Sequence, residues 1–385
     1  MSTPSNSDVQ AKLRALVDML VGYLKETNSP KTLQSHENVD GEAIVNDLGK
    51  LGIILADNAT KVTIACKPPC IPISAIPTIE AMGETLFRIS GYIESIPIST
   101  GKTLIQIIKS TTEEILFDSA ALANSFLDEP VDPSIITSKG YLISTGVVWE
   151  ACDRFNNLPK SNKQAVITKW EERLELLKDA ILEIKKLLDQ EDNQGDEDDG
   201  WDEIFGESIN VTLSTKEKEI VELSLKLFDL VKRLFNKTLK RYIVPLDLPT
   251  YNSSNEKEET DGNRSLTKIN QTLDQYMDLC KLISDAADEL GTSLYPPQDS
   301  MAIESKVNDI SLHSQELIKQ PIIKKNNENT SRVHHTYIEE QLMLRVKVVR
   351  ASSIQAKFFY PNMTTGCFVL SFYMFLPLDN RKLEN

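Results

Sequence analysis

The sequence predicts an all-α protein with two antiparallel helical bundles joined by an acidic linker, followed by an irregular C-terminal tail. Apolar residues recur every three or four positions through most of the first 320 residues, which is the spacing of one helix face. Glycine (15 residues) and aromatic residues (6%) are sparse, which disfavours a β-rich fold with many tight turns. Residues 191–207 break the helical pattern with nine carboxylates and no basic side chain. We therefore expect one bundle on each side of this segment.

Six helices are predicted before the acidic segment. The first helix and the polar loop after it make up residues 1–40, and the other five make up an N-terminal bundle over residues 41–190. The proline-rich residues 67–77 and Pro159 each end a helix, because proline cannot continue one. Each helix has an apolar stripe, and antiparallel neighbours would cover it. The expected helices span residues 11–26, 41–66, about 78–95, 101–127, 134–157 and 161–190.

The helix at 161–190 has the clearest pattern. Its apolar residues alternate steps of four and three, which is a heptad seam, but the seam lasts for fewer than three heptads. This length favours one helix of a bundle. The alternative is a zipper between chains, which would give a helix-mediated hetero- or homodimer. The seam consists of Trp170, Leu174, Leu177, Ile181, Ile184 and Leu188.

Residues 191–210 form the predicted acidic linker, and residues 211–320 form the C-terminal bundle. Its helices are expected at 214–241, 266–291 and 300–320, with a polar loop at 251–265. Ser214 and Glu217 have the spacing of a capping box, which predicts a helix start. Gly291 is a plausible C-cap, because glycine readily adopts the left-handed conformation that often ends a helix.

Residues 321–385 form the atypical tail, which loses helical periodicity. Its most apolar run, Cys367 to Leu376, is too short for a membrane-spanning helix, which needs about 20 residues. We therefore expect no stable membrane insertion. The tail is either a small appendage that binds a partner or contributes to the core, or non-homologous sequence with no selected fold. Conflicting local signals favour the second interpretation.

No catalytic, cofactor-binding or metal-binding constellation is found in the sequence. The stretch STGKT (residues 99–103) resembles a phosphate-binding loop, but the required glycine is replaced by Ile96, so Gly101 and Thr103 are expected to serve the start of a helix. The five scattered cysteines and the polar N-terminus predict reduced thiols in an intracellular protein. A net charge of −15 disfavours direct binding to nucleic acid. The remaining class is a non-enzymatic protein that binds other proteins.

The acidic segment contains the candidate partner-binding site. Three large apolar side chains would anchor it in a groove, and the carboxylates would speed the encounter with a basic surface. A solvated linker with an intramolecular staple onto the bundles is favoured over partner docking, and mimicry of nucleic acid toward a basic protein is a further alternative. The candidate residues are Asp196, Glu197, Asp198, Asp199, Trp201, Ile204 and Phe205.

Three stretches resemble the cyclin-D-binding protein family, also called GCIP. They are TGVVWEACDRFNNLPKSNKQAV (145–166), the acidic DEDDGWDEIFGE (196–207) and AADELGTSLYPPQDS (286–300). The resemblance implies two helical bundles and a non-enzymatic regulator of cell-cycle progression, present in nucleus and cytoplasm, that binds D-type cyclins. It also implies a helix-loop-helix protein without a basic DNA-contacting region. It does not extend into the tail.

The predicted function is therefore a cell-cycle regulator that binds proteins, among them cyclins, through helix faces and the acidic segment. The alternative is a structural adaptor, because vinculin and talin are also built from helical bundles.

Overall fold

The computed structural model describes residues 3–26, 40–129, 131, 140–189, 213–248 and 256–320. These ranges contain nine α-helices and no strand, which confirms the all-α fold class. The predicted linker (191–210) and the predicted tail (321–385) lie entirely outside these ranges. The α-helices are α1 (Asn6–Glu26), α2 (Gly41–Cys66), α3 (Pro72–Glu94), α4 (Lys102–Asn124), α5 (Tyr141–Arg154), α6 (Asn162–Asp189), α8 (Thr215–Thr238), α9 (Glu256–Ser293) and α10 (Ser300–Lys319).

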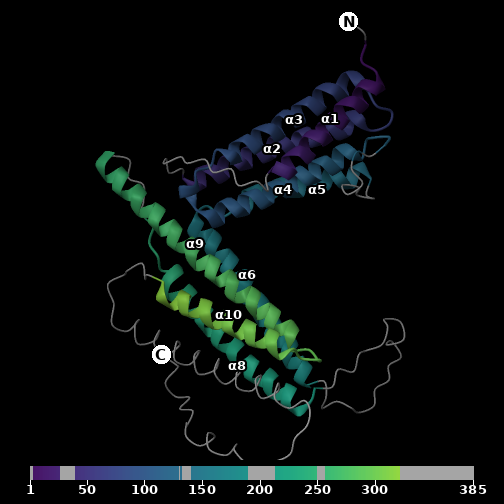
Figure 1. Cartoon of the computed structure of the whole chain (residues 1–385). Coiled ribbons are helices and arrows are strands. Elements are labelled where there is room, and N and C mark those ends of the chain that lie inside the picture. The colour runs from purple at the N-terminus through teal and green to yellow at the C-terminus, as the bar shows by residue number, and fades with distance from the viewer. Residues whose placement is uncertain are drawn as a thin grey trace, which may run out of the picture.

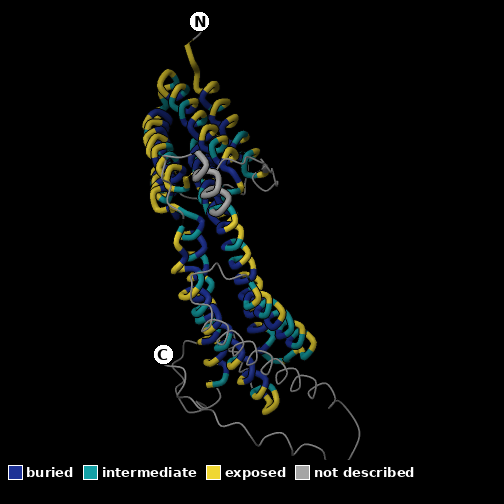
Figure 2. The backbone as a smooth tube through the Cα atoms, turned by 90° about the vertical axis from the view of Figure 1, so that its left-hand side faces the viewer, coloured by how far each residue is buried: buried dark blue, intermediate teal, exposed yellow. Residues whose placement is uncertain are grey.

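Helices α1 to α5 form the N-terminal group, in the upper part of Figure 1. Contacts between them close a ring in the order α2, α3, α1, α4, α5. The apolar stripes face the inside of this ring, so that the buried residues form one hydrophobic core (dark blue in Figure 2). Its fully buried members include Leu13, Leu48, Met82, Ile108 and Phe155.

Helices α6, α8, α9 and α10 form the C-terminal group, in the lower part of Figure 1. The largest fully buried side chain of its core is Trp170 of α6. The Trp170 indole N–H donates a hydrogen bond to the carbonyl of Phe235 on α8 (3.2 Å), and the two rings lie 5.3 Å apart. A buried indole needs such a partner, because an unpaired polar group in the core destabilises the fold.

The division between the two cores differs from the predicted division of the chain. The buried residues up to Ala165 belong to the first core, and those from Val166 onward belong to the second. Helix α6 was predicted in the N-terminal bundle, but its heptad residues Trp170, Leu174, Leu177, Ile181 and Ile184 are buried in the C-terminal group. Packing within one chain thus accounts for this seam, as the bundle interpretation predicted. Helix α1, placed by itself in residues 1–40, is part of the first core.

The predicted starts of α3 and α9 and the predicted C-cap of α9 are wrong. Helix α3 begins at Pro72, six residues earlier than expected, and includes Pro77. Pro72 is tolerated because the N–H groups of the first turn have no partner within the helix, whereas Pro77 lies further inside it. Helix α9 begins at Glu256, so residues 256–265 of the predicted polar loop are helical, and Gly291 lies inside the helix rather than at its cap. Adding residues to a helix that has already formed costs much less free energy than forming its first turn, so polar residues next to α9 can join it.

The capping box at the start of α8 is confirmed. The Glu217 N–H donates to the Ser214 hydroxyl (3.3 Å), and the Ser214 N–H donates to the Glu217 carboxylate (2.8 Å). This pair satisfies two backbone donors that would otherwise lack partners at the helix start. In the described part of the chain, no helix has the length and apolar character needed to cross a bilayer.

A polar joint connects the two groups at the start of α4. Asp274 of α9 accepts hydrogen bonds from the backbone N–H groups of Lys102 (2.8 Å) and Thr103 (3.0 Å). The interpretation that Gly101 and Thr103 serve a helix start is confirmed, since Gly101 is the N-cap of α4. The position where a phosphate-binding loop would hold its anion contains the Asp274 carboxylate instead.

Two asparagines complete the joint. Asn162, at the start of α6, accepts a hydrogen bond from the Leu104 N–H (3.0 Å) and donates one to Asp274 (3.0 Å). Asn270 of α9 donates to the carbonyls of Ser99 (2.9 Å) and Thr100 (3.1 Å). Both asparagines are buried. The two groups are therefore joined by hydrogen bonds with specific geometry, in addition to helix α6, whose first turn reaches the N-terminal core.

Candidate functional site

The seven predicted partner-binding residues lie outside the described residues, between the end of α6 and the start of α8. They are Asp196, Glu197, Asp198, Asp199, Trp201, Ile204 and Phe205. Their role as linker, staple or docking segment stays a prediction. The candidate site in the described part of the chain is instead a helix face of the N-terminal group.

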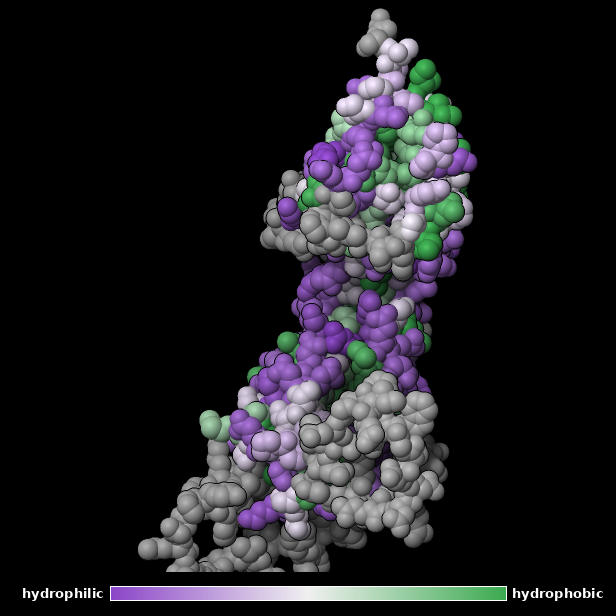
Figure 3. Space-filling view, turned by 90° about the vertical axis from the view of Figure 1, so that its right-hand side faces the viewer, coloured by the Kyte–Doolittle hydropathy of each residue, from purple (hydrophilic) through white to green (hydrophobic). Residues whose placement is uncertain are grey.

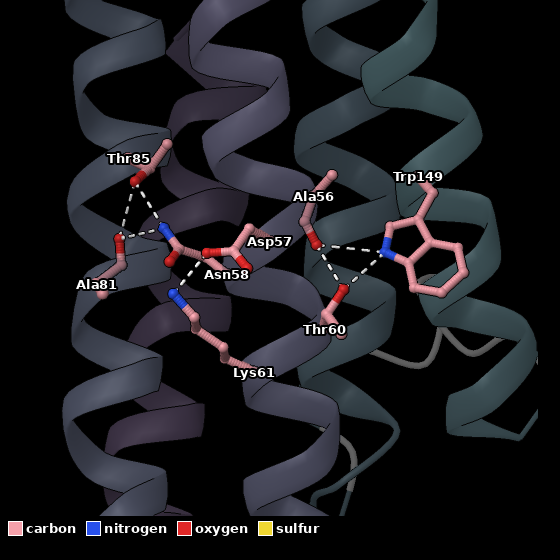
Figure 4. Close-up of polar contacts among 8 residues, drawn as sticks. All are labelled: Ala56, Asp57, Asn58, Thr60, Lys61, Ala81, Thr85 and Trp149. Atoms are coloured by element: carbon pink, nitrogen blue, oxygen red, sulfur yellow. Dashed lines mark hydrogen bonds and ion pairs between the residues drawn. The ribbon is translucent and has the colours of Figure 1, made fainter.

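Trp149 of α5 is the centre of this face. Its indole N–H is shared between two acceptors on α2, the carbonyl of Ala56 (3.2 Å) and the hydroxyl of Thr60 (3.0 Å). Figure 4 shows the ring beside α2 with its N–H directed at both acceptors. The side chain is 45% exposed. The hydrogen bonds thus hold a large aromatic side chain at the surface, with part of the ring open to solvent.

Helices α2 and α5 approach closely behind Trp149. A Cβ at Gly52 would lie 3.1 Å from the carbonyl oxygen of Cys152 and 3.2 Å from the ring of Phe155, so a larger residue here would require these neighbours to move slightly. Thr63 and Thr145 share a hydrogen bond of 2.6 Å within this interface. The stretch that resembles the GCIP family therefore has a packing role on its inner side and presents Trp149 on its outer side.

We define the α2–α5 face as the outer surface of α2 and α5, where six apolar side chains, Trp149 among them, are exposed. Ile53 (66% exposed) lies on α2, and Leu142 (70% exposed) lies on α5. Apolar side chains also appear as green patches on the N-terminal helices in the view of Figure 3. Exposed apolar clusters of this kind are typical of protein-interaction surfaces. The face consists of Ile53, Ile54, Ile64, Leu142, Ile143 and Trp149.

The sequence contained a signal for this face that the prediction did not use. The stretch GIILADNATKVTIAC has Ile53, Ile54 and Ile64 at positions outside the buried stripe of α2. A helix that covers only one core is normally polar on its outer side. Apolar residues on both sides of α2 therefore indicate a second apolar contact, although the pattern by itself does not distinguish a contact within the fold from a contact with a partner.

The stretch at 286–300 has a structural role. The Tyr295 hydroxyl donates to the Glu183 carboxylate of α6 (2.7 Å), and Asp299 caps α10 by accepting from the Met301 N–H (2.8 Å). Partial burial, and then the hydrogen bond and charge of Glu183, raise the pKa of Tyr295 to about 12. The phenol is thus a neutral donor at physiological pH, and this stretch ties α9 and α10 to α6.

The two buried thiols near the α2–α5 face do not have the lowered pKa of a catalytic nucleophile. Burial, followed by the charges of Asp153 and Asp118, raises the pKa of Cys152 to about 12. Burial also raises the pKa of Cys66 to about 12, with a contribution from Cys70. Nucleophilic thiols need the opposite shift, because the thiolate is the reactive form. Across the described ranges, no group of three or more His, Cys, Asp and Glu residues is placed to hold a metal ion.

Two family models match the chain and together cover more than half of it. The N-terminal model described as "Grap2 and cyclin-D-interacting" matches residues 47–190, and the C-terminal model of the same description matches residues 197–319. The boundary between them falls near the acidic segment, whereas the two hydrophobic cores meet at Ala165 and Val166.

Individual relatives are similar over comparable lengths. A cyclin-D1-binding protein 1 homolog of Danio rerio is 28% identical over 263 residues, which are 66% of this chain and 70% of that protein. Cyclin-D1-binding protein 1 of Homo sapiens is 24% identical over 351 residues, 87% of this chain and 89% of that protein. An uncharacterized protein of Schizosaccharomyces pombe is 23% identical over 248 residues, 63% of this chain and 72% of that protein. With both of its helical regions matched, the chain belongs to the Grap2 and cyclin-D-interacting protein (GCIP) family.

Proposed function

We propose that this protein is a non-enzymatic regulator of cell-cycle progression that binds a D-type cyclin. Membership of the GCIP family is the observation that supports this proposal most directly. The names of the relatives in Danio rerio and Homo sapiens state that those proteins bind cyclin D1. The exposed apolar residues on α2 and α5 supply a surface that suits a protein partner.

The α2–α5 face is the proposed primary contact. Aromatic residues that are half-exposed in the free protein and become buried on binding often contribute much of the binding free energy, and tryptophan is enriched among them. Trp149 is held by its two hydrogen bonds to α2, so little conformational freedom remains to be lost on binding. Ile53 and Leu142 would extend the apolar contact on either helix.

The acidic segment is the proposed secondary contact. Asp196, Glu197, Asp198 and Asp199 would accelerate association with a partner that has a basic rim, because complementary charges steer diffusing proteins. The segment would then be anchored in a groove of the partner by Trp201, Ile204 and Phe205. A partner that meets both contacts would gain affinity from each, and we propose that such binding takes place in nucleus and cytoplasm.

Binding to a purified D-type cyclin tests the apolar contact. The variant with Ile53→Ser and Leu142→Ser should bind roughly tenfold more weakly, since two apolar side chains would lose their contact with the partner. The matched control has Leu182→Ser and Leu312→Ser, which are 57% and 53% exposed on α6 and α10. The control should bind as the unchanged protein does. Equal binding by both variants would exclude the α2–α5 face as the contact surface. If the unchanged protein does not bind, a D-type cyclin is excluded as the partner.

Replacing both aromatic residues of the acidic segment, Trp201→Ala and Phe205→Ala, tests the secondary contact. Weaker capture of the cyclin at an unchanged melting temperature would support docking. Unchanged capture would show that the segment does not dock, and a lower melting temperature would favour the intramolecular staple. No observation favours the structural adaptor over a regulator.

A further inference from the structure

Five basic residues lie along one side of α8 and the π-helix that continues it (Leu239–Ile243). Within the stretch Leu230 to Leu246 there is no Asp or Glu, in a chain whose net charge is −15. Three of the five are spaced by four residues, which places them in a line along a helix. We call this set the α8 basic stripe; it consists of Lys226, Arg233, Lys237, Lys240 and Arg241.

The charge of the stripe is uncompensated among the residues that the structure describes. None of its five members forms an ion pair there, whereas other cations of the same group do. Arg173 pairs with Asp285 (2.5 Å) and Lys232 pairs with Asp229 (2.9 Å). Uncompensated like charges on one helix face destabilise the free protein slightly. Such an arrangement is favourable only when an anionic partner neutralises it.

The local electrostatics agree with this geometry. Partial burial, and then the positive charges of Arg241 and Arg233, lower the pKa of Lys237. The three cations are therefore close enough to repel one another. The π-helix at the end of α8 adds a second observation, because π-helical turns within α-helices are rare and often occur at functional sites.

The spacing of the stripe points to the shape of its partner. Arg233, Lys237 and Arg241 follow one another at about 6 Å along the helix axis, from a rise of about 1.5 Å per residue. Alternate residues of an extended peptide are separated by about 6.6 Å and lie on the same side. An extended peptide with an acidic residue at every second position can therefore place one carboxylate opposite each cation.

We propose that the α8 basic stripe binds an extended acidic peptide segment of a partner protein. A nucleic acid fits this chain less well, because carboxylates elsewhere on the protein would repel a long polyanion, whereas a peptide presents only a few charges. Val244, 46% exposed at the end of the stripe, provides an apolar contact for a neighbouring side chain of the peptide. This surface is separate from the α2–α5 face, and the proposal does not depend on cyclin binding.

Fluorescence anisotropy with the full-length protein tests the proposal. The probe is a labelled synthetic peptide of alternating aspartate and glycine that ends in tryptophan. The variant with Arg233→Gln, Lys237→Gln and Arg241→Gln should bind roughly tenfold or more weakly than the unchanged protein, since three ion pairs are lost. The double variant Arg233→Gln, Arg241→Gln, which changes only exposed residues, should show a smaller loss in the same direction.

The matched control removes the same charge elsewhere, with Lys185→Gln, Lys186→Gln and Lys281→Gln, which are exposed on α6 and α9. It should bind within about twofold of the unchanged protein, and an equal loss in this control would overturn the proposal by showing a general field effect. Binding of anionic lipid vesicles or duplex DNA through the stripe, with no binding of the peptide, would also overturn it.

A second comparison examines the chain's own acidic segment as the occupant. In this variant Asp196, Asp198 and Asp199 are replaced by Asn and Glu197 by Gln. If the unchanged protein does not bind the peptide and this variant does, the occupant is the chain's own segment rather than a partner, and the proposal is overturned. Failure of both proteins to bind the peptide overturns it as well.

Discussion

Thr103 of α4 donates both its backbone N–H and its hydroxyl to the same carboxylate oxygen of Asp274 on α9, at 3.0 and 2.7 Å. The two residues are 171 positions apart in the chain. The Asp274 carboxylate caps α4 as an N-cap side chain would, and it lies where a negative charge is stabilised by the helix dipole. Gly101, the residue at the N-cap position itself, has no side chain for this purpose. The joint therefore couples the folding of the two helix groups.

Replacing Asp274 by Ala should lower the free energy of unfolding by about 2 kcal/mol, because two backbone N–H groups, the Thr103 hydroxyl and the Asn162 amide lose their acceptor in a partly buried position. Urea unfolding followed by circular dichroism measures this change. Asp278→Ala is the matched control, since it removes an exposed ion pair of the same helix with the Lys102 ammonium group (2.8 Å). We expect the free energy of unfolding of the control variant to fall by less than about 1 kcal/mol. Equal losses would contradict a capping role for Asp274.

Replacing Gly101 by Ala should destabilise the protein by about 3 kcal/mol. Gly101 has a φ of 117°, and a Cβ there would lie 2.1 Å from Cγ of Asn162. Both the left-handed backbone and the overlap with the joint oppose a side chain. Gly146→Ala on α5 is the control, because nothing lies within 4 Å of its added Cβ and alanine favours the helix by about 1 kcal/mol. In thermal unfolding, the melting temperature should fall for Gly101→Ala and rise for Gly146→Ala. Shifts in the same direction would refute the geometric argument.

Replacing Ser214 by Ala should cost about 1 kcal/mol of stability through loss of the capping box. Burial by itself raises the pKa of Glu217, but the hydrogen bonds from Ser214 and Gln298 outweigh it, and the pKa lies below its ordinary value of 4.5. A lowered pKa in the folded state contributes stability that is fully present above pH 4.5 and is lost as the pH falls through the folded-state pKa.

Glu217→Gln isolates this pH dependence. The difference in urea midpoint between the unchanged protein and the variant should be constant at neutral pH and shrink as the solution is acidified below pH 4.5. A difference that grows on acidification would have the wrong sign for a carboxylate that is stabilised in its ionised form.

Cys70 should react with iodoacetamide before the other three cysteines that the structure describes. Burial raises the pKa of Cys70, Cys66, Cys152 and Cys280, but only Cys70 is partly exposed. Peptide mapping by mass spectrometry at increasing reaction times gives the order directly. Equally fast labelling of Cys280, on α9, would reveal opening of the C-terminal core.

Much of the secondary structure could be predicted because its signals are local. The ranges predicted for α2, α6 and α10 agree closely with the observed helices, and the capping box placed the start of α8 correctly. The errors at Pro72, Glu256 and Gly291 have a common cause. Proline, glycine and polar residues weaken a helix by amounts that packing and helix extension can override. The apolar residues outside the main stripe of α2 were a sequence signal for the α2–α5 face, but such residues show the same pattern whether they are buried or exposed.

The amphipathic helices follow from local sequence, because each stripe of apolar residues repeats within a single helix. Three features depend on how the helices pack in three dimensions: α6 packs with α8 and α9, Asp274 caps α4, and Trp149 lies at the surface. The physical reason is that one apolar stripe can be covered by almost any other, so local periodicity does not specify the partner. The choice depends on how all the stripes, caps and buried polar groups are satisfied together.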